Sequence, residues 1–207
     1  WKATDGKWYM LLGNFEYDAD PQKVMEYSAI QDLTTNTIEI TNEKYLINDI
    51  ARFGGDKIIF GEWQGLELIG LEVYTFQGIE TTIEKIKERA RESKIPFSQI
   101  LSDEDGIGGG VVDGLKGTKG FLGNSKPLDI WDNLRARSVP ANFTNLRSQC
   151  CFKLAEKVNN HELAIKLRYF KTNIEGYTKE QAISDLQEEL DQIKEVVNSS
   201  QNTKKAI

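Results

Sequence analysis

The chain has 207 residues, 39% of them hydrophobic, and a formal net charge of -6 at pH 7. This length suffices for one packed domain with small additions, and the acidic balance argues against a general nucleic-acid coat protein while leaving a local basic groove open. No apolar run approaches a membrane span and no signal-like leader opens the chain, so we expect a cytoplasmic protein without a membrane partner.

Residues 1–42 are aromatic and turn-rich without a clear period, and we interpret them as a lead-in that packs on the main domain. The first residue is Trp1 rather than methionine, which favours a fragment of a longer protein. Beyond this lead-in, segments 43–51, 57–65 and 66–76 have the alternating, β-branched character of strands. The short glycine-containing connections between them predict antiparallel neighbours.

An amphipathic helix is predicted over residues 78–94, because its apolar residues recur at helical spacing and its charges lie opposite them. Residues 97–103 predict a fourth strand, which should be parallel to its partner because a helix precedes it. The glycine cluster and residues 111–115 together predict a short helix, and residues 119–124 predict a fifth strand. The apolar face of the first helix consists of Ile79, Ile83, Ile86 and Ala90.

The remainder of the chain predicts an irregular segment over 126–143, a helix over 145–160 and a last helix that begins with a capping box of Thr178 and Gln181. The adjacent Cys150 and Cys151 fall in a helical pattern, so reduced thiols are expected. Three antiparallel strands, a helix and then alternating strands and helices are the order of an α/β ribonuclease H-like mixed sheet, here with extra C-terminal helices. The expected apolar stripes are Leu146, Cys150, Leu154 and Val158 in one helix, and Ile183, Leu186, Leu190, Ile193 and Val197 in the last.

Three acids stand directly before four glycines in "DEDGIGGG", residues 103–110. Bare backbone N–H groups of a glycine-rich turn suit phosphate, but neighbouring carboxylates repel it, so a divalent cation between them is the simplest explanation. We expect a left-handed φ in at least one of these glycines, Gly106, Gly108, Gly109 or Gly110. A dinucleotide fingerprint is disfavoured, because Val111 stands where the third glycine belongs.

The predicted topology brings the carboxylate of the central first strand, Asp49, close to one at the end of the fourth strand, Asp103. Mg²⁺ prefers such hard oxygen ligands, and two ions roughly 4 Å apart can activate water and stabilise the leaving oxygen of a phosphodiester. Asp49 could instead be a structural acid bonded to a neighbouring loop. Asp105 is a rival of Asp103, because the turn could aim either carboxylate at the metal.

Basic residues between positions 116 and 147 could line a DNA groove or belong to a solvated loop. Arg52 in the first hairpin could contact phosphate or be an ordinary hairpin residue, and Asp113 is expected to be a solvated helix residue. His161 is the only histidine, which leaves little material for histidine-based zinc or triad chemistry. The basic candidates are Lys116, Lys119, Lys126, Arg135, Arg137 and Arg147.

Four segments in order resemble the C-terminal nuclease domain of the large terminase subunit of tailed bacteriophages: "YLINDIARFGGDKIIFGEW", "ILSDEDGIGGGVVDGLKG", "KGFLGNSKP" and "NFTNLRSQCCFKLAEKVN". The resemblance assigns residues 43–207 to the nuclease domain. The lead-in, residues 1–42, is similar to the segment that joins the family's ATPase to its nuclease. No G-x-x-x-x-G-K-[ST] phosphate loop occurs in the chain, so the ATPase half is expected to be absent from it.

The resemblance implies a Mg²⁺- or Mn²⁺-dependent endonuclease that cuts concatemeric double-stranded DNA, with the portal or procapsid and the small terminase subunit as partners in the cytoplasm of a bacterial host. It makes Asp49 and Asp103 the first two metal acids, and Asp56 either an accessory ligand or a residue that contacts a ligand. The family's third acid is expected on a helix downstream of Ile207. With that acid missing, a non-catalytic DNA-binding or assembly module remains an alternative, as does another ribonuclease H-like nuclease such as a junction resolvase.

Overall fold

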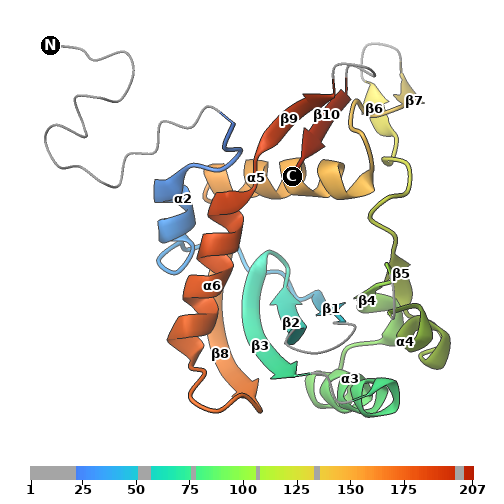
Figure 1. Cartoon of the computed structure of the whole chain (residues 1–207), viewed down its shortest axis with the longest axis vertical. Helices are drawn as coiled ribbons and strands as arrows, with labels where there is room; N and C mark the ends of the chain where they lie inside the picture. The colour runs from blue at the N-terminus through green and yellow to red at the C-terminus, as the bar shows by residue number, and fades with distance from the viewer. Residues whose placement is uncertain (1–21, 51–56, 76–77, 106–107, 133–135, 199–202) are drawn as a thin grey trace, which may run out of the picture.

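A computed structural model of the chain describes residues 22–50, 57–75, 78–105, 108–132, 136–198 and 203–207. Its centre is a six-stranded sheet with the strand order β5-β4-β1-β2-β3-β8 (Figure 1). The first three strands are antiparallel, whereas β4 is parallel to β1, β5 to β4, and β8 to β3. The strands are β1 Lys44–Asp49, β2 Lys57–Gln64, β3 Glu67–Thr75, β4 Ile100–Asp103, β5 Lys119–Phe121 and β8 Ala164–Thr172.

The ribonuclease H-like order predicted from the sequence is confirmed, and β8 is an addition that the sequence analysis does not predict. Two small hairpins stand outside the main sheet: β6 Ile130–Asp132 with β7 Arg137–Val139, and β9 Glu195–Asn198 with β10 Thr203–Ala206. The helices are α2 Tyr27–Asp32, α3 Ile79–Ser93, the 3₁₀ turn η1 Phe97–Gln99, α4 Gly108–Gly114, α5 Leu146–Asn159 and α6 Lys179–Gln192. None of the helices in the described ranges is long and apolar enough to cross a membrane.

One face of the sheet is covered by α3 and α4 (Figure 1). The predicted apolar face of α3 is confirmed: Ile86 and Ala90 are buried, and Ile79 and Ile83 pack beside them. Gly114 of α4 serves this packing, because a Cβ at that position would lie 2.5 Å from Ile83 Cδ1. The expected left-handed φ is absent from the three glycines of the cluster that fall in α4, and Gly106 lies outside the described residues.

The other core lies between the sheet and the helices α2, α5 and α6 (Figure 1). Its buried side chains include Ile30 of α2, Val158 of α5 and Ala182 of α6. The capping box that was predicted for the start of α6 is confirmed, but Ile193 takes an extended backbone and ends the helix. The helical stripe therefore stops short of Val197, which belongs to β9.

The prediction for α5 is confirmed only in part. Leu154 and Val158 pack in the core, whereas Cys150 is exposed and Ser148 and Gln149 are buried. The side chains of Ser148 and Gln149 form hydrogen bonds with backbone groups of neighbouring segments. Gln149 Oε1 accepts from the N–H of Leu128 at 2.7 Å, and its Nε2 donates to the carbonyl of the same residue. Both cysteines are free thiols, as predicted.

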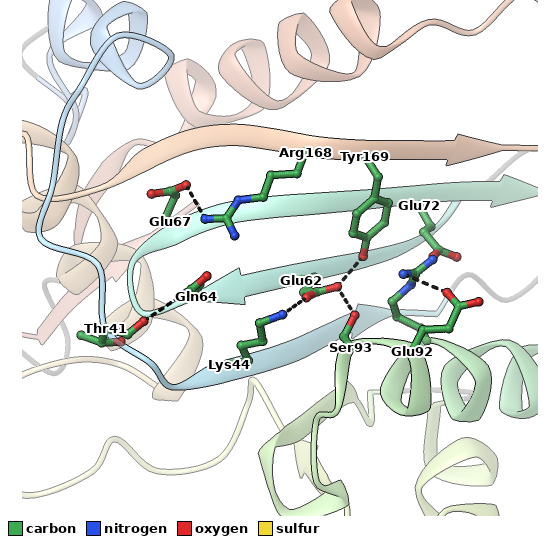
Figure 2. A network of polar contacts seen from close by, with 11 residues as sticks. Thr41, Lys44, Glu62, Gln64, Glu67, Glu72, Glu92, Ser93, Arg168 and Tyr169 are labelled. Atoms are coloured by element: carbon green, nitrogen blue, oxygen red, sulfur yellow. Dashed lines mark hydrogen bonds and ion pairs between the residues drawn. The ribbon is translucent and has the colours of Figure 1, made fainter.

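A polar network ties β8 to the sheet on the α3 side (Figure 2). The Glu62 carboxylate, which is only 2% exposed, accepts from Tyr169 Oη at 2.8 Å. It also accepts from Ser93 Oγ at 2.5 Å and Lys44 Nζ at 3.0 Å. Burial by itself raises the pKa of Glu62, but the three hydrogen bonds together hold that pKa below its ordinary value.

The ring of Tyr169 reaches Glu62 by crossing β3 at Gly70. A Cβ on Gly70 would lie 2.1 Å from ring atoms Cε1 and Cζ, so only glycine leaves room for the ring. The guanidinium of Arg89 lies 4.2 Å from the ring centre, and its Nε donates to the buried Glu72 carboxylate at 2.5 Å. This network therefore joins α3, β2, β3 and β8 at one place.

Candidate metal centre

Asp49 and Asp103 lie at the carboxyl ends of two neighbouring parallel strands. The pairing of β1 with β4 ends at Asn48 opposite Ser102, so the next residue of each strand is one of the two acids. Asp49 is also the cross-strand partner of Ile59, whose side chain packs in the α2, α5 and α6 core. Because directly opposite residues share a face, Asp49 faces the side of the sheet that α6 covers.

The electrostatics of Asp49 show that several charged groups converge on it. Asp49 is exposed as a residue, but partial desolvation of its carboxyl raises the carboxyl pKa, and the charges of Asp103 and then Glu189 raise it further. The nearby charge of Arg147 and a hydrogen bond from the backbone of Ile50 act in the opposite direction without cancelling the rise. The charged groups around Asp49 are therefore mainly negative.

Glu189 of α6 is a carboxylate that the sequence analysis missed. The third acid that the resemblance implies beyond Ile207 stays a prediction; within the described residues, the charge of Glu189 raises the pKa of Asp49. One turn earlier on α6, Asp185 accepts from Lys57 Nζ of β2 at 2.7 Å, which fixes the helix to the strand beside β1. The available signal was the acidic face of the last helix, but only the tertiary packing selects Glu189 from its neighbours.

The turn after β4 gives Asp105 a different environment from Asp103. The N–H of Asp105 donates to Asp103 Oδ1 at 3.0 Å. Its own Oδ2 accepts from the N–H of Gly123 at 3.1 Å and from Arg147 Nη2 at 2.9 Å. Asp105 is thus turned toward the segment after β5 and the start of α5.

The first turn of α5 is fixed where it approaches the acids. The Asn145 side chain caps the helix by accepting from the N–H of Ser148 at 2.9 Å. The N–H of Arg147 donates to the carbonyl of Gly123 at 2.9 Å. A Cβ on Gly123 would lie 2.8 Å from Arg147 Nε, so this glycine lets the guanidinium rest against the backbone.

The other predicted site residues fall into two groups, those that the structure does not describe and those that it places on the surface. Arg52, Asp56 and Arg135 lie outside the described residues. Asp113 is exposed on α4, as predicted. The remaining basic candidates for a DNA groove, Lys116, Lys119, Lys126 and Arg137, are exposed and stay a prediction.

The donor set fits a hard divalent cation. Two carboxylates on adjacent strands, one of them with a raised pKa, would be relieved of repulsion by a positive ion between them, and magnesium sites are commonly completed by water and substrate phosphate. In the part of the chain that the structure describes, no three carboxylate, histidine or cysteine groups stand close enough together to hold a metal ion by themselves. Any ion held here would therefore draw on ligands besides these side chains.

Comparison with solved structures identifies domains of the same fold. The nuclease domain of the large terminase subunit gp2 of bacterial virus Sf6 superposes with a TM-score of 0.70 at 16% identity, covering 89% of this chain and 87% of that one. A variant of that domain with manganese and beta-thujaplicinol gives a TM-score of 0.69 over the same shares at 16% identity. The large terminase nuclease from thermophilic phage G20c gives 0.52 at 12% identity and 89% of each chain. No protein-family model and no curated protein matches the sequence.

Proposed function

We propose that this chain is the nuclease domain of a phage large terminase subunit, a Mg²⁺- or Mn²⁺-dependent endonuclease that cuts concatemeric double-stranded DNA during packaging. The observation that carries the proposal is the position of Asp49 and Asp103 at the ends of the neighbouring parallel strands β1 and β4. The fold shared with the Sf6 nuclease domain supports the same assignment.

In this proposal Asp49 and Asp103 hold the metal, and Glu189 is a nearby carboxylate that adds negative charge to the site. A bound divalent ion lowers the pKa of a coordinated water and offsets the charge of the phosphate. Partial desolvation and the neighbouring acids keep a proton on Asp49 to a higher pH than usual, so this carboxyl has to lose its proton before it can act as a ligand. The hydrogen bond from the N–H of Asp105 orients Asp103 for the same task.

The partners follow from the same assignment. Double-stranded DNA is the substrate, and the exposed basic residues Lys116, Lys119, Lys126 and Arg137 are candidates for contacting its backbone. We place the protein in the cytoplasm of a bacterial host, with the portal or procapsid and the small terminase subunit as its packaging partners.

Cleavage of a plasmid and of a long linear duplex tests the proposal. We expect cutting of both in Mg²⁺ or Mn²⁺, none in EDTA, and little dependence on sequence because phosphate contacts carry no sequence information. A four-way junction of the same length is the matched substrate. Strong preference for the junction would identify a resolvase and contradict a packaging nuclease.

A non-catalytic DNA-binding or assembly module is the second candidate. It is favoured by the finding that no three candidate ligands form a ready metal cluster among the described residues. Calorimetric titration with Mn²⁺, with and without duplex DNA, separates the two. Duplex binding that neither requires Mn²⁺ nor leads to cleavage would support the module.

A further inference from the structure

The ion pair between Asp105 and Arg147 gives Asp105 a role that differs from the metal ligand considered from the sequence, and it makes the predicted DNA contact of Arg147 specific. Resting on the proposed function, we propose that Arg147 contacts a phosphate of DNA bound at the acids, and that Asp105 positions its guanidinium and is not a metal ligand. The pair lies beside Asp49 and Asp103 without being part of their strand ends.

The Asp105 carboxylate binds Arg147 directly. One oxygen, Oδ2, accepts both the Gly123 N–H and Arg147 Nη2. That arrangement links the turn after β4, the segment after β5 and the first turn of α5 through a single carboxylate. A carboxylate that already has a cationic partner gains less from a metal ion than Asp49, whose neighbours are mainly acids.

Arg147 is positioned by these contacts, and among the described residues its guanidinium still has N–H groups without a partner. Its backbone N–H is bonded to the Gly123 carbonyl, and its guanidinium rests against that residue. The side chain is 52% exposed. Within the described ranges, only Nη2 of the guanidinium has a partner, so Nε and Nη1 are free to donate.

A fixed guanidinium with free donors next to two metal acids has the properties of a phosphate-binding group. Arginine presents its N–H groups in a planar fork that matches two phosphate oxygens, and a fixed fork loses little conformational entropy on binding. The geometry places this guanidinium next to the acids: Asp105, which accepts from Arg147 Nη2 at 2.9 Å, donates its own backbone N–H to Asp103 Oδ1 at 3.0 Å.

The first test measures binding of a fluorescent duplex in Ca²⁺ over a range of KCl concentrations. If Arg147 neutralises one phosphate, Arg147→Ala weakens binding and reduces the slope of log K against log [KCl] by about one. Arg147→Lys restores the slope but not the full affinity, because lysine lacks the fork. The control is Lys153→Ala, an exposed cation of the same helix, which should leave the slope unchanged.

The coupling of the two residues is tested by a double-mutant cycle in the same assay. Asp105→Asn should weaken duplex binding, and adding Asp105→Asn to Arg147→Ala should cost nothing further, because Asp105 acts through the arginine. Melting curves check that every variant is folded. A slope unchanged by Arg147→Ala, or additive losses in the double variant, would overturn the inference.

Manganese binding, followed by electron paramagnetic resonance without DNA, tests the role of Asp105 separately. Asp105→Asn keeps the backbone N–H that orients Asp103, so Mn²⁺ affinity should change less than about threefold, whereas Asp103→Asn should lower it more than about tenfold. An equal loss in both variants would make Asp105 a ligand. If the wild type fails to bind duplex at all, both the inference and the proposed function fail. If it binds but the variants do not follow this pattern, only the inference fails.

Discussion

Asp49 and Asp103 lie next to each other at the ends of the parallel strands β1 and β4. The last paired residues of the two strands are Asn48 and Ser102, and each acid is the next residue of its strand. In the proposed mechanism neither can be replaced by an amide. We expect Asp49→Asn and Asp103→Asn each to lower the Mg²⁺-dependent cleavage rate by at least about a hundredfold, since each removes a charged metal ligand.

The control for these variants is Asp113→Asn, which removes an exposed carboxylate from α4. Plasmid cleavage and circular dichroism are measured for all three proteins. Near wild-type cleavage by Asp49→Asn would remove the proposed metal role, whereas loss of activity in Asp113→Asn would show that the assay reports general charge.

The raised pKa of Asp49 predicts that Asp49→Asn, which removes a proposed metal ligand, makes the folded protein more stable. Partial desolvation of its carboxyl and the charges of Asp103 and Glu189 make the folded protein bind this proton more tightly than the unfolded chain does. Stability from this group is therefore present at low pH and is lost as the pH rises through the folded pKa. In EDTA at pH 7, we expect Asp49→Asn to melt at a higher temperature than the wild type.

The same reasoning fixes the pH dependence of that difference. The stability gain of Asp49→Asn should shrink as the pH falls toward the ordinary aspartate pKa of about 4, because wild-type Asp49 is then also neutral. Melting temperatures at a series of pH values measure it. A gain that is constant from pH 4 to pH 7 would point to packing and not to charge.

Glu189 provides a prediction that the sequence did not offer. Glu189→Gln should lower Mn²⁺ affinity and cleavage together, and it should lower the pKa of Asp49 by removing one of the acids that raise it. Its neighbour Glu188, also exposed on α6, gives the matched control Glu188→Gln. Equal behaviour of the two variants would leave no special role for Glu189.

The contact of Tyr169 with Gly70 predicts a stability effect far from the acids. Gly70→Ala should destabilise the protein by about 1–3 kcal/mol, because a methyl group cannot fit beneath the ring. Tyr169→Phe should cost about 1 kcal/mol by removing a hydrogen bond to the buried Glu62. Urea denaturation measures both.

Two further proteins test the cause of that effect. In a Tyr169→Ala background the added cost of Gly70→Ala should largely vanish, because the ring that the methyl group would meet is gone. Gly109→Ala is the control, since the nearest atom to its Cβ, Glu104 Cγ, would be 3.9 Å away. If Gly70→Ala lowers the free energy of unfolding equally with and without the ring, the contact with Tyr169 is not the cause of the destabilisation.

The sequence predicts those parts of the fold that have a local period. The alternation of β1 and the spacing of Ile86 and Ala90 in α3 follow from one face being buried, whereas β3 is rich in apolar residues because both of its faces are buried. The cap at Thr178 is a local hydrogen-bond pattern. The strand β8 has an alternating stretch over residues 165–169 that the sequence analysis does not use, and its pairing with β3 is a distant contact that local pattern cannot show. The hairpins β6–β7 and β9–β10 are three or four residues per strand, too short for a period to appear.

The same limit applies to the site. Asp49 and Asp103 could be paired from the sequence because strand order alone makes them neighbours. The charge of Glu189 acts on Asp49 only because α6 packs on the sheet. Asp105 and Arg147, which form an ion pair, are 42 residues apart in the sequence. Such contacts depend on tertiary structure that no local pattern encodes.

The attachment of β8 also has a consequence for the order of folding. The pair Gly70 and Tyr169 joins positions nearly a hundred residues apart, whereas β1, β2 and β3 pair through short connections. Closing so long a loop costs entropy before its contacts form, so β8 is expected to dock after the rate-limiting step. Tyr169→Phe should therefore speed unfolding with little change in the folding rate, as stopped-flow measurements in urea would show.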